Sequence, residues 1–263
     1  MTPDVLLETR DLRVAVPQRV LVAEFSCAVR NGEFIALLGS NGAGKSLLLR
    51  TLAGLRPANA GSVRLDGQEL GALPRRAIAR RMGFLPQDPD APPQGSLFES
   101  VLLGRHAHLG FWESSGLADE QRASQALEDV GLTPLGRREL HTLSGGEQRR
   151  AAIARLLVQA PAIYLLDEPT NHLDPAQQLG ILEHVRGLAR HGAAVLASLH
   201  DPNLALRFAD QAWLLAGDGT VEVVPCAALG PAHLARLYGI DYEEARLGGQ
   251  RFMAPAQTSG SRL

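Results

Sequence analysis

The chain has 263 residues, of which 45% are hydrophobic, 21% charged and 5% aromatic, a composition typical of a folded globular protein that excludes fibrous and disordered classes. Lysine and arginine together number 26 against 28 acidic residues, so the formal net charge is -2, which argues against nucleic acid as a partner. The only cysteines, Cys27 and Cys226, are too few for a disulfide framework, and a reducing compartment fits best.

Membrane-spanning and export segments are not expected from this sequence. The longest apolar stretch, residues 151–166, is interrupted by Arg155, Gln159 and Pro161 and falls short of the roughly 18 apolar residues that a spanning helix needs. The first residues lack the basic and then apolar pattern of a signal peptide. We therefore expect one cytoplasmic domain over residues 1–250 and a polar tail without fixed structure over 251–263.

The apolar pattern predicts an α/β fold. Strands are expected at 6–16, 20–29 and 34–38, and a helix begins at Lys45, where leucines recur at helical spacing. Further strands are expected at 62–65, 83–86, 162–167, 193–199 and 211–215, several of them separated by helix-length segments. Residues 88–141 carry no strand signal and include an amphipathic helix, which indicates an inserted helical subdomain. The expected architecture is a largely parallel sheet with an antiparallel β subdomain and this insertion.

A glycine-rich loop lies between the strand at 34–38 and the following helix. It fits the pattern G-x-x-x-x-G-K-[ST], whose backbone N–H groups and helix N-terminus form a cradle for phosphates. Lys45 would reach the β- and γ-phosphates, and the Ser46 hydroxyl would bind Mg²⁺. The alternative is an ordinary glycine-rich turn, which the strand and helix context disfavours. The loop residues are Gly39, Ser40, Asn41, Gly42, Ala43, Gly44, Lys45 and Ser46, followed by Leu47.

Two adjacent carboxylates end the apolar strand at 162–167. Charges at the end of a buried strand are costly unless a cation or a reaction uses them. Asp167 suits a Mg²⁺ shell, and Glu168 suits a base that polarises the water attacking a phosphoryl group. The alternative is a solvated acidic turn before Pro169.

Residues 143–148 read Leu-Ser-Gly-Gly-Glu-Gln and precede a helix. Ser144 and Glu147 have the spacing of a capping box. A cap alone does not need Gly145 and Gly146, which cost roughly 0.5 to 1 kcal/mol each relative to alanine in a helix, so the pair indicates a close approach to the backbone. The exposed N–H groups of this helix N-terminus would receive a second phosphate.

In order and spacing, these motifs resemble the ATP-binding subunit of ABC transporters. The resemblance extends from about residue 6 to residue 239 and also includes Gln87, the segment 171–174 and a histidine after a later strand, His200. It implies the ABC ATPase cassette fold with a P-loop NTPase core, ATP hydrolysis, and ATP and Mg²⁺ as cofactors. It also implies a homodimer in which the signature segment of one copy contacts the ATP bound by the other.

The remaining roles follow from this resemblance, residue by residue. Gln87 resembles the glutamine that senses Mg²⁺ and water, and His200 resembles the histidine that contacts the γ-phosphate. With Glu168, these two residues form the expected catalytic set. Mg²⁺ would be held by Ser46, Gln87 and Asp167. The signature consists of Ser144, Gly145, Gly146, Glu147 and Gln148, and the D-loop, which crosses the dimer interface, consists of Asn171, His172, Leu173 and Asp174.

One position departs from the family pattern. The family usually stacks adenine on an aromatic residue some two dozen positions before the phosphate loop, and residues 14–20 contain none. We expect an apolar base contact through Val16 or Val20 in place of the stacked aromatic residue.

Segments 100–112, 119–132, 198–210 and 233–253 resemble the ATPases that power import of cobalamin, haem or ferric siderophores. The resemblance implies integral-membrane permease subunits as partners, an indirect link to a substrate-binding protein, and a peripheral location on the cytoplasmic face of the inner membrane. Phe111 and Trp112 either pack within the helical subdomain or contact the permease. Three alternatives remain: an importer ATPase for another substrate, an ABC-type ATPase of translation or DNA repair, and a degenerate nucleotide-binding regulator. The second lacks room here for tandem cassettes, and the third would be expected to lack Glu168, His200 or the signature.

Overall fold

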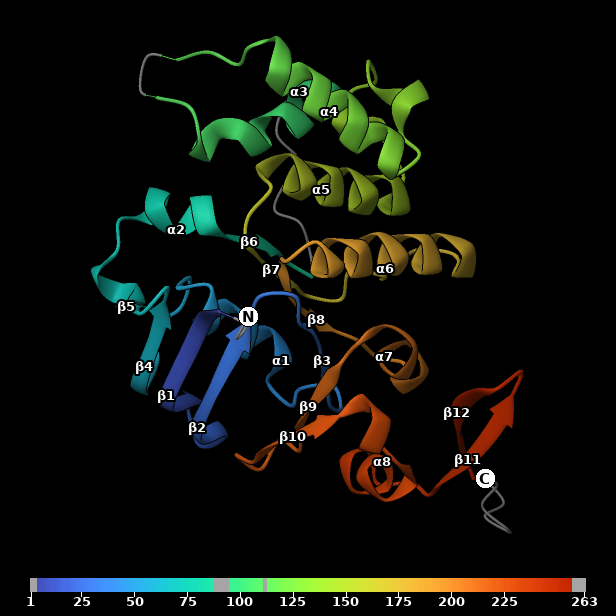
Figure 1. The fold of residues 1–263 in the computed structure, drawn as a ribbon. Coiled ribbons are helices and arrows are strands. Elements are labelled where there is room, and N and C mark those ends of the chain that lie inside the picture. Colours follow the sequence, from blue (N-terminus) through green and yellow to red (C-terminus); the bar gives the residue numbers. More distant parts are fainter. Residues whose placement is uncertain (1–3, 88–94, 111–112, 257–263) are drawn as a thin grey trace.

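The computed structural model describes residues 4–87, 95–110 and 113–256 of the chain. Two sheets lie side by side, with helices packed against the larger one, and a small hairpin projects at the C-terminal corner (Figure 1). Phe111 and Trp112, which were expected to pack within the helical subdomain or to contact the permease, lie outside the described ranges, as do residues 88–94.

The smaller sheet is antiparallel, with strand order β2-β1-β4-β5. In β1, Leu7, Leu12 and Val14 are buried while several intervening residues are exposed, which is the pattern of a sheet with one solvated face. This is the predicted antiparallel β subdomain. Its strands are β1 (Val5–Val16), β2 (Arg19–Arg30), β4 (Ala60–Leu65) and β5 (Gln68–Glu69).

The larger sheet has the strand order β10-β9-β3-β8-β7-β6, and its strands from β9 to β6 are parallel. Strands β3, β7 and β8 are buried along their whole length, because helices or the other sheet cover both faces. The predicted segments at 34–38 and 211–215 coincide with β3 and β9. The strands are β3 (Phe34–Leu38), β6 (Met82–Leu85), β7 (Ile163–Leu166), β8 (Ala194–Ser198), β9 (Gln211–Leu215) and β10 (Val221–Pro225).

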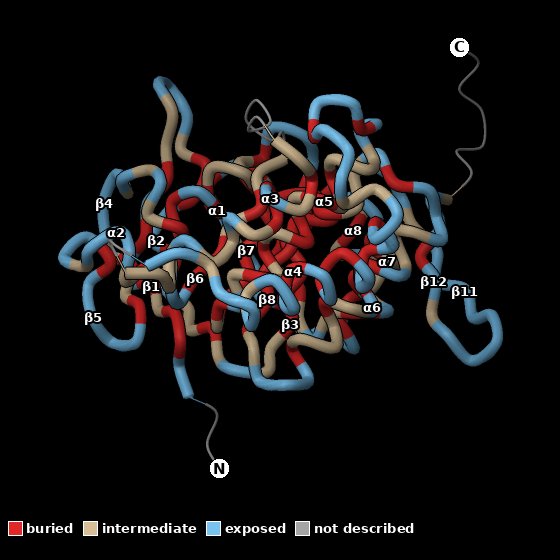
Figure 2. Tube along the Cα trace, turned by 90° about the horizontal axis from the view of Figure 1, so that it is seen from above, coloured by how far each residue is buried: buried red, intermediate tan, exposed pale blue. Residues whose placement is uncertain are grey.

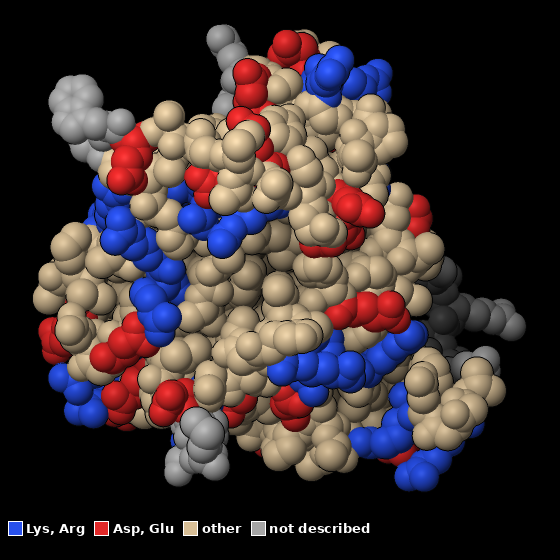
Figure 3. Space-filling model, turned by 45° about the horizontal axis from the view of Figure 1, so that its top comes forward, with Lys and Arg blue, Asp and Glu red and all other residues tan. Residues whose placement is uncertain are grey.

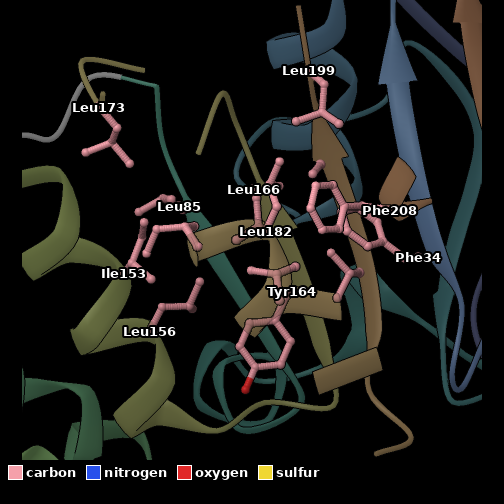
Figure 4. Packing of buried hydrophobic residues seen from close by; sticks show 14 of the residues in the cluster. Phe34, Leu85, Ile153, Leu156, Tyr164, Leu166, Leu173, Leu182, Leu199 and Phe208 are labelled. Atoms are coloured by element: carbon pink, nitrogen blue, oxygen red, sulfur yellow. The ribbon is translucent and has the colours of Figure 1, made fainter. Parts of the chain in front are cut away.

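The two faces of this sheet form two separate cores, as the alternation along β3 illustrates. Phe34, Ala36 and Leu38 join the core under α5, α6 and α7 (Figure 4), whereas Ile35 and Leu37 face α1 and the antiparallel sheet. Buried residues therefore concentrate along the middle of the molecule, and exposed ones lie at its rim (Figure 2). The helices are α1 (Lys45–Leu52), α2 (Arg75–Arg81), α3 (Leu97–Leu102), α4 (Leu117–Asp129), α5 (Gly145–Gln159), α6 (Pro175–Arg190), α7 (Pro202–Phe208) and α8 (Pro231–Tyr238).

Helices α3 and α4 lie between β6 and β7 in the chain and pack on α5 (Figure 1). Both fall in the segment expected to be a helical subdomain, and its described residues contain no strand longer than the single bridge between Ser96 and Glu139. Short 3₁₀ segments complete the connections. They are η1 (Leu70–Ala72), η2 (Leu103–Ala107), η3 (Thr133–Leu135), η4 (Leu140–Thr142) and η5 (Cys226–Ala228).

The C-terminal region is more ordered than the sequence suggested. Strands β11 (Tyr242–Leu247) and β12 (Gln250–Pro255) pair as an antiparallel hairpin, so residues 251–255, expected in the tail, belong to a strand. The side-chain amide of Asn203 in α7 holds the backbone of Met253 in β12 by two hydrogen bonds. Its Nδ2 donates to the Met253 carbonyl at 3.1 Å, and its Oδ1 accepts from the Met253 N–H at 2.8 Å. The tail prediction was wrong for these residues because the stabilising contacts come from a distant helix.

No helix in the described ranges is long and apolar enough to span a bilayer. On the face seen in Figure 3, basic and acidic side chains are interspersed with uncharged surface.

Candidate functional site

The phosphate loop connects β3 to the first turn of α1. Gly42 and Gly44 have φ values of 77° and 106°, which only glycine adopts without strain. A Cβ atom on Gly44 would also lie 2.9 Å from the Cβ of Leu21, so the loop packs closely against β2. The predicted loop therefore has the backbone conformation that exposes N–H groups at a helix N-terminus.

Lys45 is the only lysine in the sequence, and it lies folded over this loop with 6% of its surface exposed. Its ammonium donates to the carbonyls of Gly39 at 2.7 Å and Ser40 at 3.2 Å. Burial lowers the pKa of Lys45 below its ordinary value, although the nearby carboxylates of Glu168 and Asp167 act in the opposite direction. The loop thus holds a cation beside the acidic pair.

The acidic pair follows β7, at the carboxyl edge of the parallel sheet. Asp167 is 1% exposed, and its Oδ1 accepts a hydrogen bond from the Ser198 hydroxyl at 2.8 Å. Its Oδ2 is buried and has no hydrogen-bond partner in the described part of the chain. A buried, unsatisfied carboxylate oxygen is costly, and a bound cation would satisfy it.

Glu168 is held from three directions. Its backbone adopts a φ of 49°, unusual for a residue with a side chain, and its N–H donates to the Ser198 hydroxyl at 2.8 Å. His200 Nε2 lies 2.7 Å from Glu168 Oε1, and the Asn171 amide donates to Oε2 at 2.6 Å. The sequence-predicted residues Glu168, His200 and Asn171 therefore meet, and they fix the direction of one carboxylate.

These groups share one cleft of about 530 Å³, within the usual size range of ligand sites. The phosphate loop forms one wall, and Gln87, Glu168 and His200 lie along it. The lining residues are Val16, Arg19, Leu21, Asn41, Gly42, Gly44, Lys45, Ser46, Leu47, Gln87, Glu168, Asn171 and His200.

Three groups in or beside the cleft fit a Mg²⁺ ion. Ser46 and Gln87, which carry a hydroxyl and an amide, line the cleft, and Asp167 supplies the unpartnered oxygen. No cluster of three histidine, cysteine or acidic side chains that could hold a metal occurs among the residues described. A site with so few protein ligands suits Mg²⁺ shared with phosphates, because this ion usually keeps waters and takes one or two carboxylates.

The signature segment does not line this cleft. Ser144 caps α5 and forms the predicted capping box, with the Glu147 N–H donating to its hydroxyl and Glu147 Oε2 accepting from its N–H at 2.7 Å. Nothing lies within 4 Å of a Cβ placed on Gly145, whereas one on Gly146 would lie 3.0 Å from the carbonyl of His172. The close approach to the backbone that the glycine pair predicted therefore occurs at Gly146, where the neighbour is the His172 carbonyl of the same chain. The space beside Gly145 is open. Gln148, the last signature residue, donates to the Leu143 carbonyl at 3.0 Å.

The four D-loop residues divide between surface and core. Asn171 lines the cleft, His172 is exposed with a φ of 62°, and Leu173 is buried in the core under α5 and α6. Asp174 caps α6, accepting from the Gln177 N–H at 2.9 Å.

Three residues outside the predicted motifs contribute to the site. Ser198, the last residue of the apolar strand β8, binds both Asp167 and Glu168. Arg149 of α5 donates to the carbonyls of Asp167 and Glu168. Arg19 lines the cleft, where an apolar base contact was expected; Val16 lines it too, but Val20 is not among its lining residues. Ser198 and Arg149 carry no motif, so only the fold reveals them.

Comparisons with known proteins agree with this geometry. Residues 22–171 match the family model described as ABC transporter. The hemin import ATP-binding protein HmuV of Rhodopseudomonas palustris is 40% identical, with 92% of this chain and 91% of that protein covered. The phosphonates import ATP-binding protein PhnC 2 of a Nostoc species is also 40% identical, covering 81% of this chain and 90% of that protein.

Solved structures give the same assignment. An inward-facing metal-chelate type ABC transporter superimposes with a TM-score of 0.82 at 27% identity, covering 97% of this chain and 99% of that one. A dimeric ATP-binding cassette bound to ADP and phosphate after hydrolysis superimposes with a TM-score of 0.75 at 26% identity, covering 84% of this chain and 99% of that one. The chain therefore belongs to the ABC transporter family and is one of its ATP-binding, ATP-hydrolysing subunits.

Proposed function

We propose that the protein is the ATPase subunit of an importer for a metal chelate such as hemin, cobalamin or a ferric siderophore. The observation that carries the ATPase part of this proposal is the cleft in which the phosphate loop faces the Glu168–His200 pair, whereas the metal-chelate cargo is supported by the similarity to relatives. Permease subunits would hold two copies at the cytoplasmic face of the inner membrane, and a substrate-binding protein would deliver the cargo to them.

The phosphate loop binds the nucleotide in this proposal. Its backbone N–H groups and Lys45 hold the β- and γ-phosphates. Ser46, Gln87 and Asp167 would hold Mg²⁺, which would offset the negative charge of the phosphates. Because Lys45 already lies over the loop and its pKa is lowered by burial, bound phosphates would favour its charged form.

Hydrolysis uses the carboxylate of Glu168. This group accepts a proton from the water that attacks the γ-phosphorus in line, a new P–O bond forms, and the bond to the bridging oxygen of ADP breaks. His200 and Asn171 keep the carboxylate in one orientation, at 2.7 and 2.6 Å from its two oxygens. His200 also lines the cleft together with the phosphate loop, where it would contact the γ-phosphate of a bound nucleotide.

A complete site requires a second copy of the chain. The exposed signature residues Ser144 and Gly145 are absent from the lining of their own cleft, and the space around Gly145 is open. Their helix N-terminus is suited to the γ-phosphate held by a partner. Two copies would therefore enclose two ATP molecules.

The wall formed by β1 and β2 would contact the base. The Arg19 guanidinium donates two hydrogen bonds to the Gly217 carbonyl, at 3.1 and 2.7 Å. A guanidinium fixed by two hydrogen bonds offers a planar face on which a purine can stack. Arg19 would thus replace the aromatic residue that the sequence lacks.

Metal chelates are favoured over other cargo by the extent of similarity. The hemin import relative and the metal-chelate transporter cover 92% and 97% of this chain, compared with 81% for the phosphonate import relative of equal identity. The test is to purify the protein from native membranes with its bound permease and measure ATP hydrolysis with candidate binding proteins. Stimulation by a binding protein loaded with hemin, cobalamin or a ferric siderophore supports the proposal, and stimulation only by a phosphonate-loaded protein contradicts it.

A further inference from the structure

Arg149 is a buried cation that lies between three of the functional motifs. It belongs to α5, five residues after Ser144, and is 2% exposed. Its Nη1 donates to the carbonyls of Pro86 and, at 3.1 Å, Gln87, while its Nη2 donates to the carbonyls of Asp167 and, at 2.7 Å, Glu168. One guanidinium therefore joins the signature helix to both segments that carry the predicted Mg²⁺ and water ligands.

The four acceptors stand at the carboxyl ends of two neighbouring parallel strands. Pro86 and Gln87 follow β6, and Asp167 and Glu168 follow β7, where the carbonyls no longer have strand partners. Charged donors form stronger hydrogen bonds than neutral ones, so a single arginine can fix both strand ends relative to each other. A lysine could not match this geometry, since it lacks the planar fork.

Glu168 depends on this contact for its backbone conformation. Its left-handed φ of 49° has to be maintained by its surroundings. Ser198 holds the N–H of the residue and Arg149 holds its carbonyl, so the backbone is clamped on both sides of the Cα atom that carries the carboxylate. Displacement of the carbonyl would rotate the carboxylate away from His200.

Helix α5 also packs against α3, α4 and η2, and its N-terminus carries the signature. A movement of this helix therefore reaches the backbone of Gln87 and Glu168 through Arg149. We propose that Arg149 is a positioning residue that links the signature helix to the carboxylate of Glu168. This inference rests on the proposed role of Glu168 as the base.

The test is a double-mutant cycle in the complete complex with its permease. Single-turnover ATP hydrolysis, ATP affinity and thermal stability are measured for R149K, R149Q, E168Q and the double variants. R150K is the matched control, because Arg150 lies on the same helix and binds only the Val130 carbonyl among the contacts described. A displaced catalytic group costs on the order of a hundredfold in rate, so we expect a loss of about that size for R149K at unchanged ATP affinity.

The cycle distinguishes positioning from general stability. If Arg149 acts through Glu168, R149K has no further effect in the E168Q background, whereas an independent effect multiplies with that of E168Q. The inference would be overturned by any of three results: rate losses of R149K and E168Q that multiply in the double variant, a normal hydrolysis rate for R149K, or loss of folded protein in both Arg149 variants. If E168Q itself hydrolyses ATP normally, the failure lies in the proposed function.

Discussion

The Nε2 atom of His200 lies 2.7 Å from the Oε1 atom of Glu168, although the two residues follow different strands of the sheet. Because β7 and β8 are parallel neighbours, their carboxyl ends share one edge and bring the two side chains together. The same edge carries Gln87 after β6 and the phosphate loop after β3. The arrangement makes Glu168 the first residue to test.

We expect Glu168→Gln to slow ATP hydrolysis by about 10²- to 10⁴-fold, the usual contribution of a general base, and to leave ATP binding intact. The ATP-bound dimer should then accumulate and be visible by size-exclusion chromatography. Glu183→Gln is the control, because this exposed glutamate on α6 makes only a 3.4 Å pair with Arg207 in the described structure. An unchanged turnover rate for Glu168→Gln would remove Glu168 from the role of base.

The lowered pKa of Lys45 predicts an unusual reactivity. Only the neutral amine reacts with acylating reagents, so a pKa below the ordinary 10.5 moves the midpoint of the labelling curve to lower pH. Because Lys45 is the only lysine, mass spectrometry can separate its modification from that of the N-terminus. We expect ATP to suppress labelling, and equal rates with and without ATP would contradict the assignment of the phosphate loop.

Complementation tests whether each site contains residues of both copies. Lys45→Ala disables the phosphate loop, and Gly145→Glu places a negative charge in the open space beside the signature. Each variant alone should be inactive, but an equal mixture should recover about a quarter of the activity, because half of the dimers contain one intact site.

The control mixture combines Lys45→Ala with the double variant Lys45→Ala/Gly145→Glu. Every copy then lacks a working phosphate loop, so no dimer contains an intact site. Full inactivity of the first mixture would show that each cleft is completed within its own chain.

Arg19→Ala should weaken ATP binding, since stacking on a guanidinium contributes about 0.5 to 2 kcal/mol. This corresponds to an increase in Kd of about two- to thirtyfold, measurable by equilibrium titration with a fluorescent ATP analogue. Arg19→Lys keeps the charge but loses the planar face and should resemble the alanine variant. Full affinity in Arg19→Lys would indicate that charge alone matters there.

The interactions of the Asp210 carboxylate should make the stability of the protein depend on pH. It accepts from Arg186 at 2.6 and 2.8 Å and from the Phe34 N–H at 2.9 Å, joining α6 to the start of β3. Partial burial raises the pKa of this carboxyl, but the hydrogen bonds from Arg186 and Phe34, together with the positive charges of Arg186 and Arg190, hold the pKa below its ordinary 3.8. Because the pKa of Asp210 is lower in the folded than in the unfolded protein, its ion pair stabilises the fold fully at pH values above the unfolded-state pKa. This stabilisation is lost as the pH falls through the folded-state pKa.

We therefore expect Asp210→Asn to lose about 1 kcal/mol of unfolding free energy at neutral pH, a modest value because the carboxylate is partly exposed. The difference from the unmodified protein should shrink below about pH 4. Urea titrations at several pH values measure it, and a difference that is constant down to pH 2 would contradict the assignment.

The sequence predicted the parts of the fold that local patterns determine. Strand β3 was predicted to the residue because all five of its residues are buried and turn signals bound it. Strands β10, β11 and β12 were missed because most of their residues are exposed and carry no alternating pattern. Their stability comes from pairing and from contacts such as that of Asn203 with Met253, which no local pattern encodes.

In the functional site, too, local motifs could be predicted from the sequence and contacts between distant residues could not. The phosphate loop, the acidic pair and the capping box have fixed spacings, so the sequence alone predicted them. Arg149 could only be recognised in the fold, because its acceptors Gln87 and Glu168 lie 62 and 19 positions away in the chain. Ser198, 30 positions from Glu168, was likewise hidden within an apolar strand.

Transport measured in vesicles shows whether ATP hydrolysis at Glu168 powers the movement of a metal chelate. The complex of this protein with its copurified permease is inserted into lipid vesicles with the cytoplasmic face outward, and the chelate-loaded binding protein is enclosed. We expect external ATP and Mg²⁺ to drive the metal chelate out of the lumen, and Glu168→Gln to abolish this movement while ATP still binds. Equal chelate movement with the active protein, with Glu168→Gln and without ATP would contradict this expectation.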